Sequence, residues 1–269
     1  MTVIFESGYT LPSGDEPLTH ARIAHSLNWL SGGTATASST ASGYDADAPL
    51  NTLTYERWKP TSLAATWAYD HGSAVECDYA CIAAHTLATE GCTVKVQYST
   101  DNVSWNDLTP ATAIASDEPI FAIFEPVTAR YWRINITAGT DEPEIGVVKF
   151  GAALQMERPI YGGHAPIKFA RQTILRSNYS ETGEYLGRTK QRTYLSTSFA
   201  WNNLTAAWIR SNWEDLQKGI EAEPFWIAWR PTTFGDVGFC QVDEVPIPQN
   251  IGVRDLMSVS MNVRARGYD

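Results

Sequence analysis

Cysteine and histidine are the residues of this chain that could serve metal or nucleophilic chemistry. Cys77, Cys81 and Cys92 fall in one short region, and Cys240 stands apart. Their spacing, C-x3-C-x10-C, lacks the paired C-x2-C units of a zinc site, and the nearest histidine, His85, is alone. The run YACIAAHTL around the second cysteine is apolar, which favours a small buried thiol. We therefore predict no metal site and no cofactor.

No group of residues forms a recognisable catalytic motif. The chain has no G-x-S-x-G elbow, and its five histidines lie in different segments. His71 follows Asp70, but neighbours on an extended chain point to opposite sides, and DHG is typical of a turn. The acidic runs at 117–118 and 141–144 are interpreted as solvated loops, with a calcium site as the less favoured alternative. We predict no catalytic residues and a protein that is not an enzyme.

A sugar-binding surface would need an exposed aromatic ring beside polar side chains. Trp29, Tyr44 and Trp58 lie in loop-like or strand-edge stretches and are the candidate carbohydrate or receptor contacts. Each has an alternative interpretation as a residue at the rim of the core. The tryptophans that fall within strand patterns are predicted to pack inside the domain.

Basic residues cluster on two strands that we expect to pair as a hairpin. They are candidate contacts of an oligomer or of a channel through a ring, together with two tryptophans from an aromatic-rich segment that follows. The candidates are Arg171, Arg176, Arg188, Lys190, Arg192, Trp208 and Trp226. The favoured alternative is a solvated sheet face or a salt-bridge surface between subunits.

The charge of the chain limits its partners and suggests a domain boundary. The net charge is −10, which argues against sequence-specific nucleic-acid binding, because phosphates require a basic face. Residues 1–155 contain 7 Lys and Arg against 18 Asp and Glu, whereas residues 156–269 contain 13 against 12. We place a boundary near this shift. No stretch of 18 or more apolar residues predicts membrane insertion, and the first residues lack a secretory signal, which favours synthesis in the cytoplasm.

The pattern of the chain predicts an all-β protein with two β-sandwich domains. Residues 1–50, rich in Gly, Ser, Thr and Ala, are predicted to be an arm or loop segment packed on the first domain. Residues 51–155 contain short strands separated by turn signals, including one that ends at DHG and two in IFAIFEPV and RYWRINIT. Residues 156–269 contain a long hairpin around SETGEYLG, one helix at about 205–220 and returning strands. Thr205 is the predicted N-cap of this helix.

The segment VQYSTDNVSWNDL, followed later by ARYWRINIT, resembles the discoidin (coagulation factor 5/8 type C) modules of the galactose-binding jelly-roll fold. Such modules show a strand, a Ser-x-Asp turn and a Trp, and then an A-R-Y-x-R-I strand. The resemblance covers residues 55–152. It implies a jelly roll with a carbohydrate-binding-like surface.

The second half is similar to tail proteins of long-tailed phages and prophages, among them distal tail and tail-tip (baseplate) components. The segments that carry this similarity are RSNYSETGEYLGR, STSFAWNNLTAAWI, PFWIAWRP and VRDLMSVSMNV, in that order. It implies a symmetric homo-oligomer, a trimer or a hexamer ring, that contacts tail-tube and tail-hub proteins. The basic hairpin would then lie near the tail channel, in loose contact with exiting DNA.

Together these observations predict a virion structural protein of the phage tail tip, assembled in the bacterial cytoplasm. Its first domain would be displayed for adhesion or docking to a host-surface glycan. The alternative is a free carbohydrate-binding, lectin-like protein accessory to a polysaccharide-degrading enzyme. That alternative predicts a monomer with measurable glycan affinity.

Overall fold

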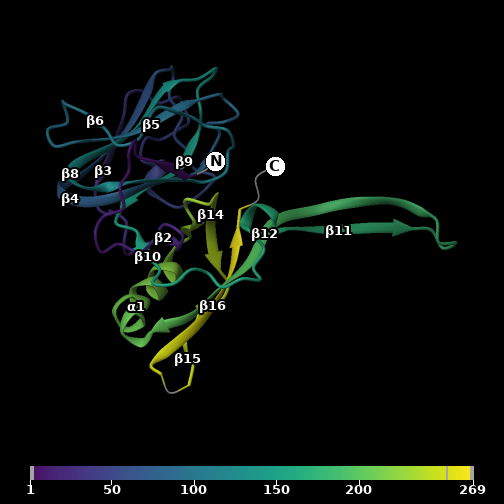
Figure 1. Cartoon of the computed structure of the whole chain (residues 1–269). Coiled ribbons are helices and arrows are strands. Elements are labelled where there is room, and N and C mark those ends of the chain that lie inside the picture. Colours follow the sequence, from purple (N-terminus) through teal and green to yellow (C-terminus); the bar gives the residue numbers. More distant parts are fainter. Residues whose placement is uncertain (1–2, 253, 267–269) are drawn as a thin grey trace.

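The computed structural model describes residues 3–252 and 254–266, and most of their regular structure is β-strand (Figure 1). Within these residues, the named strands form two sheets of eight strands each. The described strand pairs are antiparallel, apart from the parallel pair of β1 (Val3–Phe5) with β8 (Ile120–Ala138). The predicted fold class is confirmed as nearly all-β, with two mainly antiparallel sheets, a jelly roll and one packed helix; the described strands of the second domain form a single sheet.

The first domain is the jelly roll at the top left of Figure 1. Its strands follow the order β3-β4-β8-β5-β6, with β9 paired to β4, β7 to β5 and β1 to β8. The remaining strands of this sheet are β3 (Thr34–Ala37), β4 (Ala65–His85), β5 (Thr93–Ser99), β6 (Asn106–Asp107), β7 (Thr112–Ala113) and β9 (Ile145–Gly151), with a 3-10 turn, η1 (Ala48–Leu50), before β4. Of the three tryptophans predicted to pack in this domain, Trp67 and Trp132 are fully buried, whereas Trp105 is half-buried with the guanidinium of Arg133 over its ring.

Two strands of the first domain are longer than the sequence predicts. The turn predicted at residues 70–72 does not end a strand, because β4 continues through it. The extra residues of β4 bulge between the pairs Asp70–Tyr131 and Val75–Ala129. Likewise, the two strands predicted in IFAIFEPV and RYWRINIT form one continuous strand, β8. Bulges bend a strand and increase its twist, so one long strand can serve both layers of the sandwich.

The second domain lies below the first in Figure 1 and is built on the sheet β10-β2-β13-β14-β16-β12-β11. Its strands are β2 (Arg22–Ala24), β10 (Leu154–Gln155), β11 (Arg171–Tyr179), β12 (Tyr185–Thr205), β13 (Phe225–Arg230), β14 (Phe234–Val242), β15 (Gln249–Asn250) and β16 (Leu256–Ala265), with a 3-10 turn, η2 (Ile167–Phe169), before β11. Strand β2 pairs with β10 and β13. The first 50 residues are therefore not only an arm on the first domain, as predicted, because β2 belongs to the second sheet.

The strand order means that the first domain is inserted into the second. The chain starts in the first sheet with β1, crosses to the second sheet with β2, and returns for β3 to β9. It leaves again at β10, which pairs with β2. Three chain segments thus connect the domains, between β1 and β2, between β2 and β3, and between β9 and β10, which restricts their relative motion more than one linker would.

The predicted helix is present as α1 (Ala206–Ala222), the only α-helix among the described residues. The hydroxyl of Thr205 accepts a hydrogen bond from the backbone N–H of Trp208, as the N-cap role requires. The buried face of α1 includes Ile209, Trp213 and Leu216, which pack against the second sheet. Helical spacing of apolar residues and a local cap were sufficient to place this element.

The hairpin of β11 and β12 projects away from the body of the molecule, to the right in Figure 1. Residues 195–205 of β12 pair with β16 in the second sheet, but the outer part of the hairpin pairs only with itself. We call this outer part, residues 171–194, the ribbon. None of its residues is buried.

A third hydrophobic core joins the two domains, in addition to the core inside each. The first domain contributes Val3, Tyr79, Cys81, Ala83, Phe121, Ile123 and Val147, and the second contributes Ala24, Trp226, Ala228, Val237 and Phe239. Apolar contact of this kind, together with the chain segments that connect the domains, holds them in one arrangement.

Asp78 lies beside this interdomain core and should make stability depend on pH. Its carboxylate accepts a hydrogen bond from the backbone N–H of Ala153 at 2.8 Å, while burial raises its pKa to about 7. The unfolded chain ionises this group near its ordinary pKa of about 3.9, so the stability it contributes is lost as pH rises from 4 through 7. We expect Asp78→Asn to be more stable than the wild type by about 1–2 kcal/mol at pH 8 and equal to it at pH 4.

Denaturant unfolding at pH 4, 6 and 8 measures this difference. Asp101→Asn is the control of opposite sign, because backbone N–H groups of Val103 and Ser104 lower the pKa of Asp101 to about 2. That variant should lose stability at pH 8, and its deficit should shrink as the solution is acidified. If the stability difference between Asp78→Asn and the wild type does not change with pH, the raised pKa of Asp78 is contradicted.

Candidate functional site

The three aromatic residues predicted to bind sugar do not lie together. Trp58 is fully buried in the core of the first domain, and its indole N–H donates to the carbonyl of Ser39 at 3.0 Å. Its prediction as a ligand contact is wrong, because strand-edge position in the sequence did not reveal that its ring points inward. The hydroxyl of Tyr44 donates to Glu144 at 2.6 Å in a separate hollow. Trp29 alone lines the pocket described below.

The predicted interface residues also divide into two groups. The five basic candidates, from Arg171 to Arg192, all lie on the exposed ribbon. Trp208 is half-buried on α1. Trp226 is fully buried in the interdomain core, with its ring centroid 4.5 Å from that of Phe239. Its prediction as an intersubunit contact is wrong, because the first domain of the same chain covers it.

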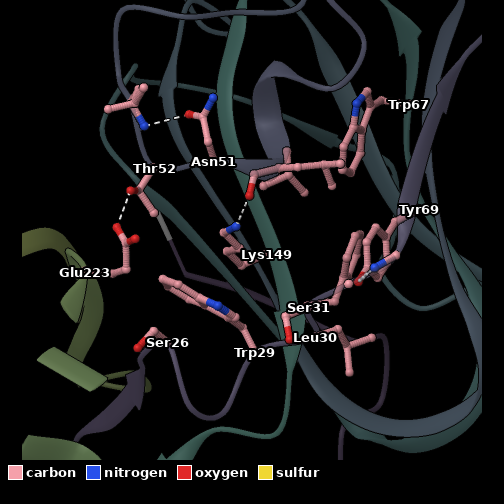
Figure 2. A pocket seen from close by; sticks show the side chains of 16 residues that line it. Ser26, Trp29, Leu30, Ser31, Asn51, Thr52, Trp67, Tyr69, Lys149 and Glu223 are labelled. Carbon is pink, nitrogen blue, oxygen red and sulfur yellow. Dashed lines mark hydrogen bonds between the residues drawn. The ribbon is translucent and has the colours of Figure 1, made fainter. Parts of the chain in front are cut away.

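A pocket of about 580 Å³ lies where the two domains meet (Figure 2). Such a volume is within the range typical of small-molecule sites. The first domain supplies residues from the end of η1, from β4 and from β9, and the second domain supplies Glu223 after α1. The loop after β2 forms the rest of the wall. We call this the junction pocket; the residues used below are Trp29, Thr52, Tyr69, Lys149 and Glu223.

The loop that carries Trp29 is held against β9 by backbone contacts. The N–H of Leu30 donates to the carbonyl of Phe150 at 2.7 Å, and Trp29 forms a β-bridge with Gly151. A Cβ at Gly151 would lie 2.1 Å from the carbonyl oxygen of Asn28, so only glycine permits this approach. The close packing fixes the position of the indole of Trp29 at the pocket wall.

Lys149 is the one lysine whose ammonium is held inside this pocket. The side chain is 8% exposed, its Nζ donates to the carbonyl of Leu50, and it lies 4.8 Å from the ring centroid of Trp29. Burial lowers its pKa to about 8, although attraction by Glu223 opposes this. Among the described residues it has no carboxylate within salt-bridge distance. A buried cation held at such cost is typical of a functional site.

Glu223 brings the second domain into the pocket. Figure 2 shows its side chain reaching toward Thr52, whose hydroxyl donates to it at 2.5 Å. The pocket therefore presents a strong donor, the ammonium of Lys149, and a strong acceptor, the carboxylate of Glu223, between aromatic walls. Tyr69 and Trp67 form the wall on the other side (Figure 2). This arrangement suits a ligand that has both apolar faces and hydroxyl groups.

Sequence reasoning missed Lys149 and Glu223. All seven residues of β9, IGVVKFG, are buried, and a lysine within such an apolar run is a signal that the printed sequence already contains. Glu223 carries no comparable signal, because it belongs to the pocket only through the packing of α1 against the first domain.

The buried cysteines and His85 have structural roles. All four cysteines are free and buried, and burial raises the pKa of each thiol, to about 11 for Cys92. Such thiols are poor nucleophiles at neutral pH. His85 accepts from the backbone N–H of Leu87 and lies 2.9 Å from the carbonyl of Glu118 through its other nitrogen, so both nitrogens are engaged by backbone. The carboxylate of Asp70 pairs with Arg130 rather than with the neighbouring histidine.

Two absences hold for the part of the chain that the structure describes. Over residues 3–252 and 254–266, no three His, Cys, Asp or Glu side chains gather as a metal ion would require. Over the same residues, no helix has both the length and the apolar composition of a membrane span.

Comparison with known proteins gives a family for the first domain. Residues 34–148 match the model of the F5/8 type C domain. No curated protein matches the chain. The match begins after Trp29 and ends just before Lys149, and Glu223 lies far outside it. The junction pocket is therefore formed by the domain together with the chain around it.

Among solved structures, chitosan-binding module 1 of a chitosanase/glucanase from Paenibacillus sp. IK-5 is 19% identical, with a TM-score of 0.41, and covers 48% of this chain and 98% of its own. CBM32-1 from a family 31 glycoside hydrolase of Clostridium perfringens is 11% identical, with a TM-score of 0.41, covering 46% and 96%. A pectin-binding carbohydrate-binding module is 20% identical, with a TM-score of 0.39, covering 44% and 88%. Residues 34–148 of this chain thus match the F5/8 type C domain model, and they form a β-domain inserted into a second one.

Proposed function

We propose that this protein is a non-catalytic structural component of the tail tip of a long-tailed phage, which displays its F5/8 type C domain for adhesion or docking. Its partners would be further copies of itself, in a trimer or hexamer ring, and the tail-tube and tail-hub proteins. The resemblance to phage tail proteins that we infer from the sequence of residues 156–269 motivates the setting.

The observation that carries the proposal is the way the F5/8 type C domain is mounted. The chain crosses between its sheet and that of the second domain three times, and the two domains share a buried core. A binding module that only keeps an enzyme near its substrate needs no more than a flexible tether. A module displayed from an ordered assembly has to keep one orientation, which a shared core provides.

The buried residues support a non-catalytic role. Thiols with raised pKa values, and a histidine whose ring nitrogens are both engaged by backbone, are poorly suited to nucleophilic or acid–base chemistry.

Immunogold electron microscopy of particles of the encoding phage tests the proposed location. Antibodies against residues 34–148 should label the end of the tail that is distal to the capsid. Label on the capsid alone, or particles that lack the protein by mass spectrometry, would overturn the proposal. Antibodies against the major capsid protein provide the positive control for labelling.

The second candidate function is that of a free carbohydrate-binding protein, which the junction pocket favours. A sugar ring has apolar C–H faces for the walls near Trp29 and Tyr69, and hydroxyls that can accept from Lys149 and donate to Glu223. The same pocket would also serve an adhesion module on a virion, so binding alone does not separate the two candidates. The assembly state does.

Lys149→Met should weaken sugar binding about tenfold, because it removes a charged hydrogen-bond donor while keeping the length of the side chain. Binding to a panel of immobilised neutral and acidic oligosaccharides measures the effect. Lys95→Met, which removes a lysine paired with Asp107 on the surface, is the matched control and should bind as the wild type does. Equal binding by both variants would exclude the junction pocket as the sugar site.

A further inference from the structure

We propose that the ribbon, residues 171–194, packs against the F5/8 type C domain of a second copy of this chain. This inference rests on the proposed assembly role and names the partner and the surface that it uses. The contact is heterologous, since the ribbon of one copy meets a different surface of the next.

The base of the ribbon contacts its own chain, where the guanidinium of Arg264 lies over the ring of Tyr194, but large apolar side chains further out are exposed. Its exposed large apolar side chains are Ile174, Leu175, Tyr179, Tyr185 and Leu186, which are between 38% and 66% exposed. A two-stranded ribbon is at best marginally stable in water unless another strand, a helix or a further surface covers it. Its length and its apolar side chains therefore indicate that something outside this chain packs on it.

The net charges of the ribbon and of the F5/8 type C domain indicate which surface covers the ribbon. The ribbon contains 5 Lys and Arg against 2 Asp and Glu, a net charge of +3. The F5/8 type C domain, residues 34–148, contains 5 against 15, a net charge of −10. Ribbon against ribbon would bring like charges together, whereas ribbon against this domain brings opposite charges together. Charge complementarity of this kind fixes the partner and the register of an interface.

Because the ribbon points away from its own chain, the contact that we propose is between two copies. It extends away from both domains of its own chain in Figure 1, so its outer part does not lie on its own F5/8 type C domain. The nine residues of β11 reach about 30 Å at the usual rise per residue, which is enough to span a neighbouring domain. A heterologous contact that repeats around an axis closes into a ring.

Light scattering of the purified chain, compared with ribbon variants, tests the contact. The wild type should be a discrete oligomer, and Arg188→Glu with Arg192→Glu should weaken association by at least about tenfold through charge reversal. Arg158→Glu with Arg210→Glu is the matched control, because both residues are exposed in the second domain outside the ribbon. A monomeric wild type, or a control that dissociates as much as the ribbon variant does, would overturn the proposal.

Zero-length carbodiimide crosslinking of a mixture of ¹⁴N- and ¹⁵N-labelled chains identifies the receiving surface. Lys190 should couple to Asp or Glu residues within 34–148, and the crosslinked peptides should carry both labels. Mixed-label crosslinks from Lys190 to the ribbon of another copy would overturn the arrangement. The absence of any mixed-label crosslink from Lys190 would overturn it as well. Either failure leaves binding to tail-tube protein unaffected, so it is distinguishable from failure of the proposed function.

Discussion

Trp226→Ala is expected to lower the free energy of unfolding by about 3–5 kcal/mol and to separate the unfolding of the two domains. Trp226 is fully buried between the domains. Its ring lies at 80° to that of Trp29, with centroids 6.1 Å apart, and its indole N–H points to the carbonyl of Ile82 at 3.4 Å. Alanine would leave a cavity that touches both domains, since neither can collapse into it alone.

Differential scanning calorimetry distinguishes this effect from a general loss of stability. The wild type should unfold in one transition, and Trp226→Ala should unfold in two. Trp58→Ala is the matched control, because that tryptophan is equally buried but lies wholly within the core of the F5/8 type C domain. A single transition at the wild-type temperature for Trp226→Ala would contradict the role of the shared core.

Lys149→Met is expected to raise the free energy of unfolding by about 2 kcal/mol at pH 7. A pKa lowered from 10.5 to about 8 means that burying the charged amine costs the wild type about 3 kcal/mol. The variant avoids this cost but also loses the hydrogen bond to Leu50, which reduces its gain by about 1 kcal/mol. The unfolded chain binds more protons than the folded one between these pKa values, so the wild type gains stability as pH rises from 8 to 10.5. The advantage of the variant should therefore disappear over that interval.

Urea unfolding at pH 7, 9 and 10.5 measures the difference between the two proteins. Lys95→Met again serves as the control for the loss of a lysine side chain, because Lys95 is paired with Asp107 outside the pocket. A variant that is more stable but binds sugar less tightly would show that Lys149 is kept for the ligand rather than for folding. A less stable Lys149→Met at pH 7 would contradict the account of this pocket.

Local patterns in the sequence predicted the elements whose signals are local. The helix was found from the spacing of Ile209, Trp213 and Leu216 and from its cap at Thr205, and the long hairpin from the turn between its strands. The resemblance to discoidin modules, carried by two strands in the right order, pointed to the domain that the family comparison supports.

Features that depend on long-range packing were not predictable in the same way. Strand β2 carries three buried residues, but nothing in Arg22–Ala24 indicates which sheet it joins. Trp58 and Trp226 have the composition of interface residues, and only the folded chain shows that other parts of it bury them completely. The junction pocket was hidden for the same reason, because its residues come from five separate segments of the sequence.

The oligomeric mass of this chain, alone and mixed with a phage tail-tube protein, tests the proposed structural role most directly. Light scattering after size exclusion should show a trimer or hexamer of this chain alone and a larger discrete complex when tube protein is added. A monodisperse monomer whose elution does not change with tube protein would contradict the structural role and favour the free carbohydrate-binding protein.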